Sequence, residues 1–244
     1  MEVGLAAVVG LAAEVPVVIG KKIPVISPVI PAWARHFLRP SDLAKIQEAV
    51  TNAEKNTTGE IIPMVVRRSS FGGHLPVLLT LILIVVVLVF EVPQLEIFDG
   101  LGAHWALILV SALCFGLGHL LSKLSLIQRW LTPKLDQAAQ VEARAELEFH
   151  RLGITGTAGL TGILLFISLM ERRAVVLADQ GISAKMSKEA WAEICQLMVQ
   201  PIGKGKTAEG ICRGIHRSGE LLTKEFPLHG ENSDELSNQL ILKE

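Results

Sequence analysis

The sequence has few cysteines and no excess of positive charge. Cys114, Cys195 and Cys212 are odd in number and form no CxxC pair, which argues against a disulfide framework or a zinc knuckle. Lys and Arg number 23 and Asp and Glu number 24, so the formal net charge is −1. A protein that binds nucleic acid through a basic patch needs an excess of cations on one face. We therefore expect no nucleic acid among the partners.

The N-terminal segment lacks a pattern that predicts a folded element. The apolar run Gly4–Ala13 has no basic region before it, so it fits a signal peptide poorly. Prolines at positions 16, 24, 28 and 31 rule out one continuous helix, and a further membrane span is a weak interpretation. We expect residues 1–38 to be an unstructured leader that is not part of the fold.

Charge is almost absent from two long apolar runs. The first covers Leu75–Val89 and can be extended to Val92, and the second covers Leu101–Leu121. Each is close to the roughly 20 residues that cross a hydrocarbon core of about 30 Å as a helix. We predict a two-helix transmembrane hairpin over residues 74–122. The alternative is a buried pair of core helices in a soluble domain.

Basic residues flank the predicted hairpin on its outer sides. Arg67 and Arg68 precede it and Lys123 follows it, whereas the connection between the runs has no Lys or Arg. The positive-inside rule then predicts a multi-pass inner-membrane protein whose remaining domain faces the cytoplasm. The expected partners are the lipid bilayer and another membrane protein.

The rest of the chain predicts a small α/β domain. Expected in chain order are an amphipathic helix up to Lys55, a strand Glu60–Val66, a helix Asp136–Leu152, strands Gly162–Leu169 and Ala174–Ala178, and helices Lys188–Gln200 and Thr207–Phe226. Strand–helix–strand order favours parallel pairing, and the strand hairpin adds an antiparallel strand. We therefore expect a mixed sheet formed by residues 39–70 and 133–226, interrupted by the hairpin. The polar residues 227–244 are expected to be a flexible tail.

Individual residues refine this prediction. Pro63 indicates that part of the first strand lies on an edge or at a bulge. The charged residues 171–173 between the second and third strands suit a solvated turn. Lys204 and Lys206 lie in a loop before a helix, which we expect to be a surface loop that could contact an anion.

A carboxylate stands at the end of the third strand. Asp179 is followed by Gly181, which is free to adopt positive φ, and this is where we expect a ligand. The alternative is that Asp179 only caps the turn before the next helix.

Four motifs in this order resemble the TPM domain family: Thr58–Ile61, Gly162–Ser168, Glu171–Arg173 and Asp179–Ile182. Their arrangement around a hairpin is similar to a membrane-anchored bacterial branch of that family, whose founding members include thylakoid-lumen proteins linked to photosystem repair. The resemblance implies a TPM-like α/β sandwich, a divalent-cation site and an acid phosphatase activity. Carried over to this chain, it implies a metal site of Glu60, Asp179 and Gly181 that holds Ca²⁺ or Mg²⁺.

Two functions follow from these observations. None of the seven histidines has a Ser, Cys or acid neighbour at the spacing of a catalytic dyad, so the first hypothesis is an interaction or assembly module that could bind a divalent ion. The alternative is a metal-assisted phosphomonoester hydrolase, in which Glu60 and Asp179 hold the ion and Lys204 or Lys206 orients the ester. A channel or transporter is disfavoured because the apolar runs carry no charge to line a pathway.

Overall fold

The computed structural model describes residues 30–69, 75–91, 101–124, 134–156, 159–228 and 236–244. The chain divides into two compact units, Met1–Ser69 with Ala138–Glu244, and Ser70–Gln137. Most of the leader predicted over residues 1–38 and the connection between the two apolar runs lie outside the described residues. The last residue of the predicted leader, Leu38, is buried in the core of the first unit.

The elements of the first unit are, in chain order, α1 (Pro40–Glu54), β1 (Glu60–Val66), α5 (Lys134–Arg151), the 3-10 helix η2 (Ile154–Gly156), β2 (Gly162–Ser168), β3 (Arg173–Ala178), α6 (Gln180–Ser183), α7 (Lys188–Ile202), α8 (Thr207–Glu225) and β4 (Ile241–Lys243). The start of α5 belongs to the second unit, which also contains α2 (Leu75–Glu91) and α3 (Leu101–Ser122).

The strands form one four-stranded sheet in the order β3-β2-β1-β4. β1 is parallel to β2 and β4, and β2 is antiparallel to β3, so the sheet is mixed as the sequence predicts. The sequence pattern does not predict β4, which lies within the segment expected to be a flexible tail. Because β4 pairs only with residues 64–66 of β1, Pro63 lies on a stretch with no strand on that side among the described residues, where its missing N–H costs no ladder bond.

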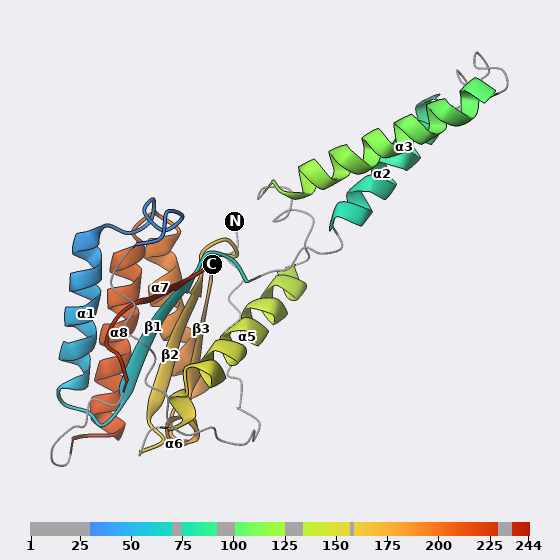
Figure 1. The fold of residues 1–244 in the computed structure, drawn as a ribbon. Helices are drawn as coiled ribbons and strands as arrows, with labels where there is room; N and C mark the ends of the chain where they lie inside the picture. Colours follow the sequence, from blue (N-terminus) through green and yellow to red (C-terminus); the bar gives the residue numbers. More distant parts are fainter. Residues whose placement is uncertain (1–29, 70–74, 92–100, 125–133, 157–158, 229–235) are drawn as a thin grey trace. The chain divides into compact units, whose positions relative to one another are not determined.

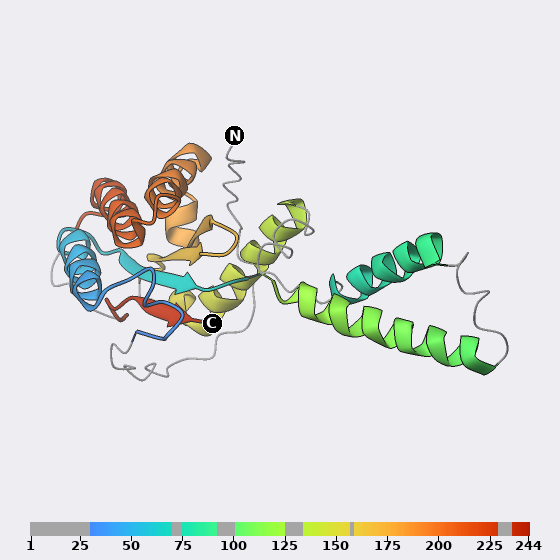
Figure 2. The ribbon, with the colours of Figure 1, turned by 90° about the horizontal axis from the view of Figure 1, so that it is seen from above.

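Helices cover both faces of the sheet (Figure 1, Figure 2). Ile61 and Val65 of β1 contribute to a core with α1, α7 and α8, whereas Ile62 and Met64 contribute to a second core with α5. All residues of β1 and β2 are buried, which explains why these strands are continuously apolar rather than alternating.

The helices of the second unit correct the prediction of a transmembrane hairpin. α2 and α3 form where the apolar runs predict helices, but none of the helices in the described part of the chain has the length and apolar composition to cross a membrane. α2 has 17 residues, which extend about 26 Å and fall short of the roughly 30 Å hydrocarbon core.

The location inferred from that hairpin is corrected with it. The prediction of a multi-pass inner-membrane protein with a cytoplasmic domain depended on two membrane spans. Without these spans, the charges that flank the apolar runs do not indicate an orientation in a membrane. What the structure shows is that α2 and α3 pack closely, because a Cβ at Gly118 would lie 2.6 Å from Oγ1 of Thr80. Apolar side chains on both helices are exposed, among them Leu81, Val85, Leu109 and Leu113.

The turn between β2 and β3 is buried at Glu171, contrary to the expectation of a solvated turn. This side chain is 8% exposed. Its carboxylate accepts hydrogen bonds from the backbone N–H of Ser69, at 3.3 Å, and from the hydroxyl of Ser168, which itself accepts from the Ser69 hydroxyl at 2.9 Å. These donors compensate the buried charge and attach the turn to the residues that follow β1.

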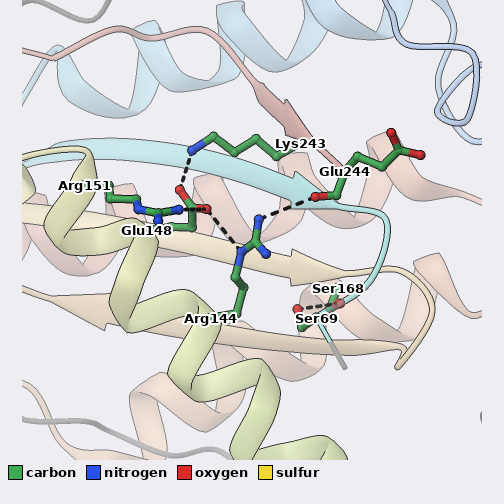
Figure 3. A network of polar contacts seen from close by, with 7 residues as sticks. All are labelled: Ser69, Arg144, Glu148, Arg151, Ser168, Lys243 and Glu244. Carbon is green, nitrogen blue, oxygen red and sulfur yellow. Dashed lines mark hydrogen bonds and ion pairs between the residues drawn. The ribbon is translucent and has the colours of Figure 1, made fainter. Parts of the chain in front are cut away.

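Glu148 of α5 is a second buried carboxylate, with 0% of the side chain exposed. Figure 3 shows cationic groups converging on it from two elements. Its carboxylate lies 3.2 Å from Nε of Arg144 and 3.6 Å from a guanidinium nitrogen of Arg151, and it also accepts a hydrogen bond from Nζ of Lys243 in β4. Arg144 donates in addition to the carbonyl of Glu244 at 3.5 Å. Through these contacts α5 holds β4 against β1.

We expect Glu148→Gln to lower the free energy of unfolding by about 3 kcal/mol, because the cations around it would lose a buried counter-charge. Lys243→Met should cost about 1 kcal/mol, since Arg144 and Arg151 still pair with the carboxylate. Urea unfolding followed by circular dichroism measures both effects.

The matched control is Glu193→Gln, which removes an exposed pair with Arg217 at 2.9 Å and should change the stability by no more than about 0.5 kcal/mol. If the Glu148 and Glu193 variants lost the same stability, the buried network would not hold β4 in the way described.

Candidate functional site

The predicted site residues Glu60 and Asp179 lie in one row across the sheet. Glu60 is paired with Gly162 of β2, and the N–H of Asp179 donates to the Gly162 carbonyl at 2.9 Å. Because neighbouring strands are about 4.8 Å apart, the α-carbons of the two acids are about 10 Å apart, with Gly162 between them. We call Glu60, Gly162 and Asp179 the carboxylate row. It lies at the end of the sheet where β1 and β2 begin, beside α6 (Figure 1).

Both carboxylates point to the face of the sheet that α5 covers. Ile62 and Leu177 belong to the core under α5, and side chains two residues apart on an extended strand share a face. Asp179 continues β3 with extended backbone angles, φ −65° and ψ 163°. Glu60 and Asp179 are each 3% exposed. The row is therefore covered by protein.

Backbone oxygens approach the row from the segment before β2. A Cβ at Gly162 would lie 2.3 Å from Cγ2 and 2.8 Å from the carbonyl oxygen of Ile154. A Cβ at Gly181 would lie 2.6 Å from the carbonyl oxygen of Leu160 and 3.3 Å from that of Gly159. Glycine is thus required at both positions for close approach. Gly181 does not adopt the positive φ that the sequence suggests, since it lies within α6.

The two oxygens of Asp179 have different environments. Oδ1 accepts a hydrogen bond from the N–H of Gln180 at 2.7 Å and so caps α6, which is the alternative role predicted for this residue. Oδ2 is buried and accepts no hydrogen bond from the described residues. Burial raises the pKa of Asp179, while the bond from Gln180 acts in the opposite direction. The cap therefore leaves one oxygen that a cation or a proton could compensate.

The structure does not bring Lys204 or Lys206 to this row. Both lysines precede the start of α8. The other end of α8 lies near Glu60, because the N–H of Thr58 donates to the carbonyl of Phe226 at 3.2 Å. With 19 residues, α8 extends about 28 Å. This separation excludes an arrangement in which either lysine orients an ester at an ion held by the carboxylate row.

The other reactive side chains of the described residues do not complete a site. No group of three or more His, Cys, Asp or Glu side chains able to hold a metal occurs in this part of the chain. Burial raises the pKa of the Cys195 thiol to about 12, so it is not a nucleophile at neutral pH. The row itself supplies two carboxylates and backbone carbonyls. Sequence reasoning missed the carbonyls, because no side-chain pattern signals them.

We expect Gly162→Ala to lower the free energy of unfolding by about 2–3 kcal/mol, since the new methyl group would overlap Ile154 and its carbonyl. The control is Gly203→Ala, where the nearest atom would be 3.5 Å away, an ordinary contact, and the loss should be below about 0.5 kcal/mol. Thermal unfolding of both variants checks the close packing over the row. Equal stability of the two would contradict it.

The raised pKa of Asp179 predicts a pH-dependent effect of Asp179→Asn. The folded chain binds this proton more tightly than the unfolded chain, so the resulting stability is present below the ordinary pKa of 3.8 and is lost as the pH rises through the raised pKa. In metal-free buffer the neutral variant should therefore be more stable than the wild type at pH 7, and this gain should disappear towards pH 3.8. Urea unfolding at several pH values measures it. A gain that is constant with pH would contradict the assignment.

Part of the chain is similar to known proteins. Residues 130–221 match the TPM domain, a stretch that includes Asp179 and Gly181 but not Glu60. The fold is similar to the NMR structure of the BA42 protein from the psychrophilic bacterium Bizionia argentinensis, with a TM-score of 0.53 and 20% identity, over 84% of this chain and 95% of that chain. The comparison with curated proteins gave no match. The match over residues 130–221 supports the resemblance to the TPM domain family that the sequence motifs indicate.

Proposed function

We propose that this TPM domain binds a divalent cation of the calcium type at the carboxylate row and acts as an ion-dependent binding module. The observation that supports this most strongly is the placement of two buried carboxylates on the same face of the sheet, at the start of β1 and the end of β3, on either side of Gly162 in β2. Asp179 is buried, and its Oδ2 accepts no hydrogen bond from the described residues, while burial penalises its charged form. A divalent ion beside Asp179 would compensate that charge, and Glu60 offers a second carboxylate on the same face of the sheet.

The chemistry of the available ligands favours calcium. The row offers carboxylate oxygens from Glu60 and Asp179, and the carbonyl oxygens of Ile154 and Leu160 lie against Gly162 and Gly181. Calcium takes six to eight oxygen ligands in flexible geometry and accepts carbonyl groups, whereas magnesium requires a near-ideal octahedron and keeps several waters. With two carboxylates the affinity should be modest, with a Kd of about 10⁻⁴–10⁻³ M.

In this proposal, an ion bound at the carboxylate row orders part of the fold and does not act directly on a substrate. It would connect the strand ends with η2 and with the residues around Leu160, whose carbonyl oxygen lies close to Gly181 of α6. In this proposal the ion orders that segment, and a protein partner recognises the ordered surface. The lysines needed to orient a phosphate ester are about 28 Å away, which favours a binding module over a metal-assisted hydrolase at this row.

Calcium titration of the full chain by isothermal titration calorimetry tests the proposal. We expect saturable binding in the range of about 0.1–1 mM, and loss of that binding in Asp179→Asn and in Glu60→Gln. At 100 times the Kd, calcium should raise the free energy of unfolding by about 2.7 kcal/mol. Because Asp179→Asn is expected to stabilise the metal-free fold, lost binding in this variant would not reflect unfolding.

The control is Glu146→Gln, which removes a carboxylate from the sequence of α5 away from the row and should leave the titration unchanged. Magnesium is titrated in parallel and should bind more weakly. Absence of saturable calcium binding up to 10 mM, or binding that survives in both row variants, would contradict the proposed site.

A further inference from the structure

The opposite end of the first unit contains an open cavity of about 430 Å³. Its walls are the segment before α1, the first two turns of α1, the loop before α8 and the first two turns of α8. We call it the helix-start cavity. α1 and α8 run in the same direction, since the end of α8 is bonded to residues that follow α1. The cavity is therefore separated from the carboxylate row by the length of both helices.

The charges around the helix-start cavity favour an anion. Four cationic side chains line it against two carboxylates: Arg35, Arg39, Lys45 and Lys206, with Asp42 and Glu209. Asp42 is already engaged, because it accepts a hydrogen bond from the N–H of Arg39 at 2.9 Å. Glu209 is paired with Lys206 at 3.1 Å and with Arg213 at 2.6 Å. The excess of positive charge remains after these pairs are formed.

The start of α8 supplies backbone donors to this cavity. Lys206 occupies the N-cap position, and no side chain of the described residues caps the helix there. The first intrahelical bond runs from the N–H of Gly210 to the carbonyl of Lys206 at 3.1 Å, so the N–H groups of the preceding turn need another acceptor. The positive end of a 19-residue helix adds to the attraction for an anion.

A buried hydroxyl points to a ligand independently of the helix end. Thr207 is the first residue of α8, lines the cavity and is only 1% exposed. Its Oγ1 makes no hydrogen bond with any group of the described residues. A buried hydroxyl without a partner is unfavourable and is rarely retained in a folded protein. An oxygen atom of a bound anion would give it an acceptor.

We propose that the helix-start cavity binds the phosphate group of a small molecule. The Thr207 hydroxyl and the N–H groups at the start of α8 donate to phosphate oxygens, and Arg39 and Lys206 compensate the charge. Lys206 can turn from Glu209 to the phosphate because Arg213 still pairs with Glu209. A volume of about 430 Å³ leaves room for a small organic group beyond the phosphate. This site is independent of the ion proposed at the carboxylate row.

Titrations of the full chain with inorganic phosphate and with glycerol 3-phosphate test this proposal and distinguish free phosphate from a phosphate monoester. They are run at constant ionic strength with a chelator present, and backbone amide shifts are followed by NMR. We expect saturable binding, with the largest shifts at residues 207–210. Sulfate should compete and acetate should not. Absence of saturation up to 20 mM, or equal effects of acetate and phosphate, would overturn the proposal.

Variants of neighbouring lysines separate a built site from general electrostatics. Lys206→Gln should weaken phosphate binding at least five-fold, whereas Lys204→Gln should leave it within two-fold, because Lys204 lies in the same loop but does not line the cavity. Equal weakening by the two variants would reduce the site to non-specific attraction and overturn the proposal.

Thr207→Val tests the hydroxyl itself. The replacement is nearly isosteric, so the fold should be retained, and phosphate binding should weaken at least three-fold. An unchanged affinity would remove Thr207 from the site and contradict the argument from its buried oxygen. Asp179→Asn, which affects only the carboxylate row, should leave the phosphate titration unchanged, so failure of the calcium site and failure of this one are distinguishable.

Discussion

Burial of both faces of β1 and β2 is the constraint on which the rest of the first unit depends. A strand without an exposed face needs a helical layer on each side, and here α1, α7 and α8 supply one and α5 the other. The same helical layers also bury the polar residues at the strand ends. Glu60 and Asp179 are therefore buried because of the layers above them and not because of any property of their own sequence neighbourhood.

Buried carboxylates in this unit are compensated in different ways. Glu148 is surrounded by cations, and Glu171 accepts hydrogen bonds from a backbone N–H and a hydroxyl. Asp179 receives one backbone N–H on one oxygen, and burial still raises its pKa. The first two arrangements explain stability without a ligand. The incomplete compensation at Asp179, in a row with Glu60, is why the carboxylate row is the stronger candidate for function.

The parallel course of α1 and α8 divides the unit into two ends with opposite electrostatic character. Both helices begin at the helix-start cavity, which is lined by cations and by the first turn of α8, and both end near the start of β1, where the acids lie. Cations and anions bound at these ends would not meet, because each helix spans more than 20 Å. A chemistry that needs a metal ion and a phosphate in one place is thus disfavoured by the fold.

Local pattern in the sequence determined the positions of the helices and of β1, β2 and β3, the mixed pairing, and the presence of an acid at the end of β3. These depend on apolar periodicity and chain order, which neighbouring residues carry. Only the tertiary structure decided that β4 completes the sheet, that Glu171 is buried, and that Lys206 lies far from Asp179. It also decided against the two membrane spans, since the charge-free runs predict helices but not their final length and continuity. Burial and the distance between residues far apart in the chain arise from packing, which no local pattern records.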